Sequence, residues 1–200
     1  MKPLSLTLKN FGPYINETID FTKFEDSSLF LISGKTGSGK TTIFDGMSYA
    51  LFGESSGKLR LGKEMRSTFA DPSEATEVTL LFKHNEFLYE LNRLPEQELF
   101  KKRGTGVRKQ SAKISLIVKD AQGKELRAYS KRREVDELIQ ELLHLNANQF
   151  AQIVLLPQGE FRTFLIAKSD EKEKVLRNLF GTELYQLFSE NLKERLKIAN

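Results

Sequence analysis

The stretch that decides the fold is Gly34-Lys35-Thr36-Gly37-Ser38-Gly39-Lys40-Thr41, which fits the phosphate-binding pattern G-x-x-x-x-G-K-[ST]. An apolar run, residues 29–32, precedes it, and a helix-forming segment, residues 42–51, follows it. The order strand, glycine-rich loop, helix predicts a P-loop, in which backbone amides and a helix N-terminus bind phosphate oxygens. The alternative, a glycine-rich turn that binds nothing, is disfavoured by these two flanks.

The pattern assigns a chemical role to the residues of this loop. Its glycines let the backbone turn tightly and approach phosphate oxygens. Lys40 is expected to reach the β and γ phosphates, and the Thr41 hydroxyl is expected to hold Mg²⁺. We therefore expect ATP and Mg²⁺ as cofactors, with these nucleotide-binding residues: Gly34, Lys35, Thr36, Gly37, Ser38, Gly39, Lys40 and Thr41.

Composition narrows the class of protein. The chain has 200 residues, of which 39% are hydrophobic and 29% charged, and it has no apolar run near the roughly 20 residues of a membrane span. The first residues alternate between apolar and polar and do not resemble a signal peptide, so we expect a cytoplasmic protein without membrane contact. The absence of cysteine excludes disulfides and thiolate metal sites, and two distant histidines disfavour zinc. Any metal is expected to arrive with a nucleotide.

Basic residues are unevenly spread, although the net charge is only +4. Lys101-Lys102-Arg103, Arg108-Lys109 and Lys131-Arg132-Arg133 form three clusters. Such clusters suit a polyanion, but solvated loops and helix ends carry them equally well.

Hydrophobic periodicity predicts sheet first and helices later. Strands are expected at residues 4–8, 15–21 and 27–33, with a turn at 10–14. The helix after the P-loop should bury Phe44, Met47, Leu51 and Phe52 and end at Gly53, before a surface loop or short helix at residues 57–72. Two hairpins follow, 78–83 with 87–93 and 113–119 with 126–129, joined by a mobile basic loop at residues 96–111.

The second half is expected to be mostly helical. Ser130 is a candidate N-cap for a helix in which Val135, Leu138, Ile139 and Leu142 recur at helical spacing, and a further helix is expected at residues 146–154. Another helix should run from Ser169 to just before Gly181. The last helix carries an apolar residue every four positions, which fits either the start of a coiled coil or an ordinary packed helix; these residues are Leu184, Phe188, Leu192 and Leu196.

A P-loop ATPase also needs an apolar strand that ends in Asp, to assist Mg²⁺. The only near match is residues 116–120, where Lys119 interrupts the apolar run and Asp120 falls at a predicted hairpin turn. We therefore expect the acidic strand to lie in sequence beyond Asn200.

Several motifs together resemble one family. Residues 8–14, 34–42, 67–72 with 77–78, 156–161 and 181–185 are similar to the N-terminal segment of the SbcC family. Members of that family are ATPase subunits of the SbcCD nuclease and relatives of SMC proteins and ABC-type ATPases. The resemblance runs through nearly the whole chain in the right order.

The resemblance implies a fold: an α/β P-loop NTPase of the ABC-ATPase type, present as its N-terminal lobe (residues 1–180) with an attached antiparallel β-sheet. A C-terminal helix (residues 181–200) would lead towards a coiled coil. The resemblance also adds Thr42 to the nucleotide-binding residues. It assigns Gln158 to a Q-loop that senses Mg²⁺ and the γ-phosphate. The expected catalytic residues are therefore Lys40 and Gln158, and the expected metal contacts are Thr41 and Gln158.

The function implied by the resemblance is ATP hydrolysis within an exonuclease complex for DNA repair and recombination. Expected partners are the C-terminal lobe of the same protein, a second head in an ATP-dependent homodimer, an SbcD-type nuclease and double-stranded DNA. DNA would be held through its phosphates; candidate contacts are Arg60, Lys63, Arg66, Lys101, Lys102, Arg103, Arg108 and Lys109. This segment alone is expected to be inactive or weakly active. The alternatives are a self-contained P-loop enzyme, such as a nucleotide kinase with a basic lid, and a P-loop interaction module without turnover.

Overall fold

The computed structural model describes residues 1–24, 29–55, 62–101 and 103–151, together with Phe188, Leu192 and Arg195. The chain divides into two compact units, Met1–Ala147 and Asn148–Asn200. Gln158 and the helix expected before Gly181 lie outside the described residues.

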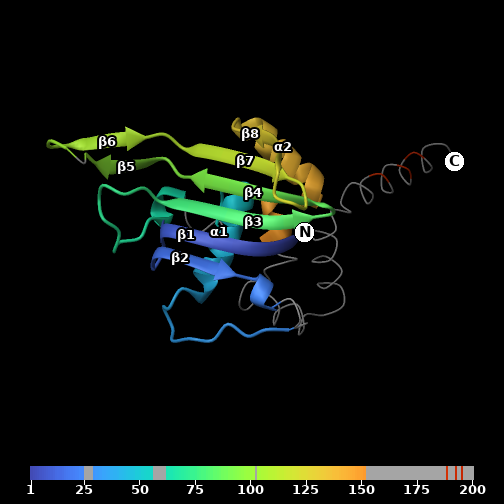
Figure 1. Ribbon diagram of the computed structural model, residues 1–200, viewed down its shortest axis with the longest axis horizontal. Helices are drawn as coiled ribbons and strands as arrows, with labels where there is room; N and C mark the ends of the chain where they lie inside the picture. Colours follow the sequence, from blue (N-terminus) through green and yellow to red (C-terminus); the bar gives the residue numbers. More distant parts are fainter. Residues whose placement is uncertain are drawn as a thin grey trace. The chain divides into compact units, whose positions relative to one another are not determined.

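The first unit is built on a six-stranded antiparallel sheet with the strand order β2-β1-β3-β4-β7-β8 (Figure 1). The strands are β1 (Lys2–Phe11), β2 (Tyr14–Asp20), β3 (Glu77–His84), β4 (Phe87–Leu94), β7 (Lys113–Lys119) and β8 (Glu125–Tyr129). Both predicted hairpins are confirmed, as β3–β4 and β7–β8. Asp120 accepts hydrogen bonds from the backbone amides of Gln122 and Lys124, so it stabilises a turn.

One face of the sheet forms the core because apolar residues recur at every second position. Leu6 and Leu8 of β1 lie opposite Leu80 and Val78 of β3, and all four are completely buried. Helix α1 (Lys40–Phe52) packs on β1, β3 and β4, and helix α2 (Arg132–Leu143) packs on β7 and on α1. The mixed α/β fold with an antiparallel sheet is therefore confirmed.

The strand expected at residues 27–33 is wrong for the part that the structure describes. Residues 29–33 form no strand, and the side chains of Leu29 and Leu31 are 87% and 88% exposed. A strand requires a partner for its backbone groups, and no described strand pairs with this run. Instead of pairing in a strand, this run makes a local contact: the ring of Phe30 stacks on that of Phe24, with the centroids 4.9 Å apart.

The mobile loop expected at residues 96–111 is also wrong, because most of it forms a second hairpin of strands β5 (Gln97–Phe100) and β6 (Val107–Gln110). Gln97 and Leu99 are buried and alternate with exposed residues, which is the period of a strand. Gly104 and Gly106 have φ angles of 81° and 106°, which glycine adopts readily in a tight reversal. The high charge of the segment concealed this alternation.

The helices differ from the predictions in detail. Met47 and Leu51 are buried in α1 as expected, but Phe44 and Phe52 are only half-buried. Gly53 ends α1 with a φ of 76°, as expected. The N-cap of α2 is Lys131, one residue after the expected Ser130. The short helix η2 (Gly62–Met65) lies within the loop or short helix expected at residues 57–72, and α3 (Ala147–Phe150) lies within the helix expected at residues 146–154. A third short helix, η1 (Thr22–Phe24), follows β2.

Asn10 joins the end of β1 to the long loop before β3. Its side chain is completely buried, and its amide nitrogen donates to the Ala75 carbonyl at 3.0 Å. The Asn10 carbonyl accepts hydrogen bonds from the backbone amide of Ser67 (2.9 Å) and the hydroxyl of Thr76 (3.1 Å). Its φ of 51° is one that asparagine tolerates better than most residues. These contacts hold the loop against the sheet.

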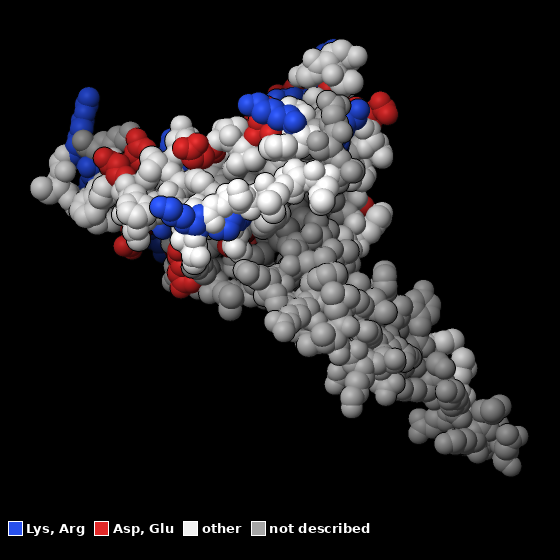
Figure 2. All heavy atoms as spheres, turned by 90° about the horizontal axis from the view of Figure 1, so that it is seen from below, with Lys and Arg blue, Asp and Glu red and all other residues white. Residues whose placement is uncertain are grey.

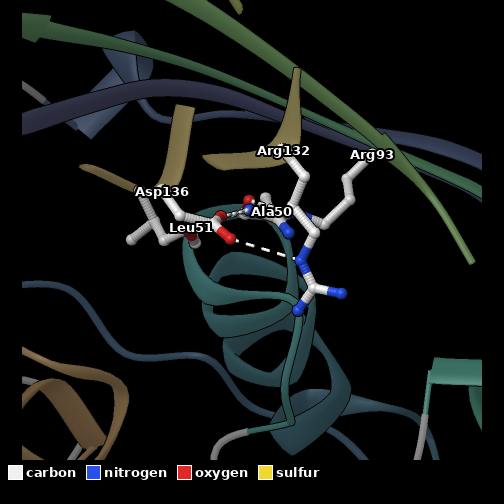
Figure 3. Close-up of polar contacts among 5 residues, drawn as sticks. All are labelled: Ala50, Leu51, Arg93, Arg132 and Asp136. Atoms are coloured by element: carbon white, nitrogen blue, oxygen red, sulfur yellow. Dashed lines mark hydrogen bonds and ion pairs between the residues drawn. The ribbon is translucent and has the colours of Figure 1, made fainter. Parts of the chain in front are cut away.

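Arg93 is a buried cation that fixes the end of α1 (Figure 3). Its side chain is 6% exposed; Nε donates to the Ala50 carbonyl at 3.0 Å, and Nη2 to the Leu51 carbonyl at 3.2 Å and to Asp136 of α2 at 3.0 Å. These carbonyls belong to the last turn of α1, where helix geometry leaves them unpaired. Burial lowers the pKa of Arg93, and Asp136 opposes that shift. Arg93 thus ties α1 and α2 to β4.

We expect Arg93→Met to lower the free energy of unfolding by about 2–4 kcal/mol, because two buried carbonyls lose their donor and Asp136 keeps only Arg132 as a cationic partner. The measurement is urea unfolding followed by circular dichroism. The matched control is Arg133→Met, since Arg133 is an exposed member of an i,i+4 pair with Glu137 and should change nothing measurable. Equal stability of the two variants would contradict the role of Arg93.

We expect Gly46→Val to lower the free energy of unfolding by about 1–3 kcal/mol, because even a Cβ atom there would lie 2.6 Å from Cδ2 of Leu8. The same substitution in a Leu8→Ala background should cost less, since the colliding methyl group is absent. A double-mutant cycle in urea measures this coupling. Additive effects would show that the two residues do not press on each other.

Candidate functional site

The P-loop sequence folds as a turn that leads directly into α1. The amide of Ser38 donates to the Lys35 carbonyl at 3.2 Å, and Gly37 and Gly39 have φ angles of 85° and 93°. Gly39 is the N-cap of α1 and makes no side-chain capping bond. The first amides of a helix have no partner within the helix, and its N-terminus favours negative charge. The structure therefore places an uncapped helix N-terminus beside a glycine-rich turn, as the motif predicts.

Lys40 closes this turn. Its Nζ donates to the carbonyls of Gly34, six positions earlier, and of Lys35, five positions earlier, both at 2.8 Å. The ammonium group thus lies against the loop at the point where α1 begins. A cation held there by backbone carbonyls is suited to an anionic ligand on the same loop.

The two threonines after Lys40 differ in their surroundings. Thr41 is exposed, so its hydroxyl is accessible to a metal ion carried by a nucleotide. Thr42 is buried, and its methyl group packs against Gly12, where a Cβ atom would lie 2.5 Å from Cγ2 of Thr42. The side chain of Thr42 is therefore part of the packing between α1 and the turn after β1.

Tyr14 and Pro13 hold the N-cap of α1, although their sequence context indicates only a turn. The Tyr14 hydroxyl donates to the Gly39 carbonyl at 3.1 Å. A Cβ atom on Gly39 would lie 2.6 Å from Cγ of Pro13 and 2.9 Å from the Tyr14 oxygen, so only glycine fits. Burial, and then the charge of Glu17, raise the pKa of Tyr14, so its hydroxyl stays a donor. Nothing in the local sequence signals this contact, because 25 residues separate the partners.

The basic residues considered for DNA do not form one group. Arg66 is committed to the protein itself: Nη1 donates to the Glu74 carbonyl at 2.6 Å and Nη2 to the Asp71 carbonyl at 2.8 Å. Arg60 and Lys102 lie outside the described residues, as does the side chain of Lys63. The remaining candidates lie on or beside the β5–β6 hairpin: Lys101, Arg103, Arg108 and Lys109. On the face shown in Figure 2, basic side chains are separated by acidic and uncharged ones.

The described residues hold neither a metal-binding cluster nor a membrane-spanning helix. No group of three or more acidic or histidine side chains within residues 1–24, 29–55, 62–101 and 103–151 is placed to hold a metal ion. In that same part of the chain, no helix has the length and apolar character that crossing a membrane requires.

The comparisons with known proteins agree with the motifs. A family model described as an AAA domain matches residues 5–200. Relatives named as the SbcC subunit of the nuclease SbcCD include those of Lactococcus lactis (45% identical over 199 residues), Staphylococcus aureus (47% over 197) and Vibrio cholerae (44% over 196). Each alignment covers 98% of this chain but 19% of the relative, so the chain spans about a fifth of their length. The resemblance to the SbcC family is thereby confirmed.

A solved structure described as "Structural biochemistry of ATP-driven dimerization and DNA stimulated activation of SMC ATPases" matches 90% of this chain and 99% of its own. With a TM-score of 0.47 and an identity of 17%, this likeness is weak. The family model, by contrast, covers the whole P-loop, and the family it describes implies nucleotide binding. Because that model covers almost every residue, the protein belongs to the AAA domain family.

Proposed function

We propose that this chain is the ATP-binding N-terminal lobe of an SbcC-type ATPase head. The observation that carries the proposal is the P-loop turn, which is joined to an uncapped N-terminus of α1 and closed by Lys40. Its amides and Lys40 would bind the phosphates, and the Thr41 hydroxyl would hold Mg²⁺, which polarises the phosphate when bound. The nucleotide-binding residues are Gly34 to Thr42, as the sequence predicts. Gln158 is proposed to complete the site as metal contact and catalytic residue.

The exposed apolar residues before the P-loop, 29–31, support the proposal that a partner lobe covers this surface in the whole protein. Leu29 and Leu31 are almost fully exposed, and Phe30 is 47% exposed. Exposed leucines on either side of a phenylalanine are unusual on a surface that stays in water. We propose that a strand of the C-terminal lobe of the same protein covers them, so that neither lobe hydrolyses ATP efficiently alone.

The proposed domain division places the lobe at residues 1–180 and the start of a coiled-coil helix at residues 181–200. Phe188, Leu192 and Arg195 are helical, and the side chains of Phe188 and Leu192 are 64% and 50% exposed. Two apolar residues four positions apart on an exposed helix suit a second helix as partner.

In the whole protein, ATP would favour the closed pair of heads, and this closure would control access of double-stranded DNA ends to an SbcD-type nuclease in the cytoplasm. The relatives at 44–47% identity support this function over a self-contained nucleotide kinase. The test is ATP hydrolysis by the purified chain with and without its C-terminal counterpart. Turnover only after reconstitution supports the proposal; turnover by the chain alone supports the kinase, and none in either case supports an interaction module.

We expect Lys40→Ala to abolish ATP turnover by the full-length protein, because the cation on the P-loop is lost. A steady-state phosphate-release assay measures this. Lys83→Ala is the matched control, since Lys83 is an exposed lysine on β3 and should leave turnover unchanged. Full turnover by the Lys40 variant would refute the assignment of the P-loop.

Tyr14→Phe is expected to weaken ATP binding by roughly 2- to 10-fold, which corresponds to the net value of one hydrogen bond. The reason is that the N-cap Gly39 loses the hydroxyl that positions it. Titration of the chain with a fluorescent ATP analogue and Mg²⁺ gives the affinity. Tyr129→Phe serves as the control on strand β8, and equal affinities of the two variants would show that the Tyr14 hydroxyl does not position the loop.

A further inference from the structure

A pocket of about 400 Å³ opens where the C-terminal end of α1 meets the end of β4, the start of β7 and the first residue of α2. No residue of the P-loop lines it, because it lies at the opposite end of α1. Part of its wall is apolar and part is positively charged; the residues that matter below are Leu94, Ile114, Tyr49, Arg93, Lys113 and Arg132. A cavity of this size suits a small molecule.

Arg93 brings an unused donor to this pocket. Its side chain is 6% exposed, and Nε and Nη2 make all of its hydrogen bonds to the described residues, so Nη1 donates to none of them. Nη1 lies beside Gly53, another residue of the wall, where a Cβ atom would be only 2.8 Å away. A buried cationic N–H without an acceptor is unfavourable. The pocket is therefore where Nη1 can find an acceptor.

Arg132 leaves the pocket with excess positive charge. Asp136 accepts from Arg93 through Oδ1 at 3.0 Å and from Nε of Arg132 through Oδ2 at 3.3 Å. Two guanidinium groups thus share one carboxylate, and in Figure 3 the two terminal nitrogens of Arg132 point away from it. Glu96 is the acidic residue of the wall, and Lys109 already pairs with it at 2.8 Å. An anion in the pocket would neutralise the remaining charge.

Tyr49 adds a neutral donor to the same wall. Its side chain is 4% exposed and lines the pocket. Burial raises the pKa of Tyr49 to about 12, and the charges of Arg93 and Arg132 oppose that shift, so both cations act on this hydroxyl. At neutral pH the hydroxyl therefore stays protonated and can donate to an anion.

We propose that this pocket binds a small organic anion, whose carboxylate or phosphate group contacts Arg93 and Arg132 and whose apolar part lies against Leu94 and Ile114. Guanidinium groups bind carboxylates and phosphates through paired hydrogen bonds. An apolar wall with a few convergent polar groups is the usual construction of a ligand pocket. The proposal goes beyond the proposed function, because it does not require a nucleotide on the P-loop.

The test is ligand-observed fluorine NMR on the full-length protein with two probes, para-fluorobenzoate and para-fluorophenyl phosphate. The probes share an aromatic ring and differ in the head group, so their relative affinities distinguish a carboxylate from a phosphate as the preferred ligand. A saturating non-hydrolysable ATP analogue and Mg²⁺ are present throughout, so that the P-loop is occupied. Saturable binding of at least one probe is expected.

Arg132→Gln should weaken the binding of that probe by roughly 5- to 10-fold, because a charge-assisted contact is lost. The matched control is Arg133→Gln, which removes the next cation of α2; Arg133 also pairs with an acid four positions later and should not affect binding. Ala112→Phe should weaken binding as well, because it fills the pocket from an exposed position without a change of charge. Thermal unfolding should show that all three variants fold.

No saturable binding of either probe would overturn the proposal, as would equal affinities of the Arg132 and Arg133 variants or full affinity of the Ala112 variant. Displacement of the probe by the ATP analogue would place the probe on the P-loop and overturn the proposal too. A protein that binds the probe in this way but fails to bind ATP would support the pocket and refute the proposed function.

Discussion

The close packing of α1 on β1 is the constraint on which the rest of the structure depends. It requires two glycines, because a Cβ atom on Gly46 would lie 2.6 Å from Leu8 and one on Gly12 would lie 2.5 Å from Thr42. Helix and strand backbones therefore approach more closely than side chains normally allow. Since the P-loop continues directly into α1, this packing also fixes where the loop lies relative to the sheet.

Each end of α1 is then held by a different strand. At its N-terminus, Tyr14 from the start of β2 donates to the Gly39 carbonyl. At its C-terminus, Arg93 from β4 donates to two carbonyls and to Asp136 of α2. The first contact is at the site and leaves the helix amides free for an anion, whereas the second is buried and stabilises the fold. One helix thus links the phosphate-binding turn to the centre of the sheet.

Local signals in the sequence are sufficient to predict much of the sheet and the P-loop. Alternating apolar residues predicted β1, β3, β4 and β7, and the motif with its flanks predicted the loop and α1. Two of the failures share one cause, which is dependence on distant partners. Residues 29–33 have the composition of a strand but find no strand to pair with among the described residues, and the contacts of Arg93 and Tyr14 join residues 25 to 43 positions apart. The β5–β6 hairpin was missed because its charge outweighed a short alternation.

The end of β1 connects the phosphate-binding turn to the basic β5–β6 hairpin. Asn10 holds the loop that contains Ser67 and Thr76, and Thr76 in turn holds Gln97 at the base of the β5–β6 hairpin. Four residues after Asn10, Tyr14 contacts the N-cap of α1. The phosphate-binding turn and the basic hairpin are therefore supported by the same short segment. Because buried hydrogen bonds join Asn10 to the base of the hairpin and the chain itself joins it to Tyr14, a change at Asn10 would disturb both elements together, whereas a change at the exposed tip of the hairpin would leave the P-loop in place.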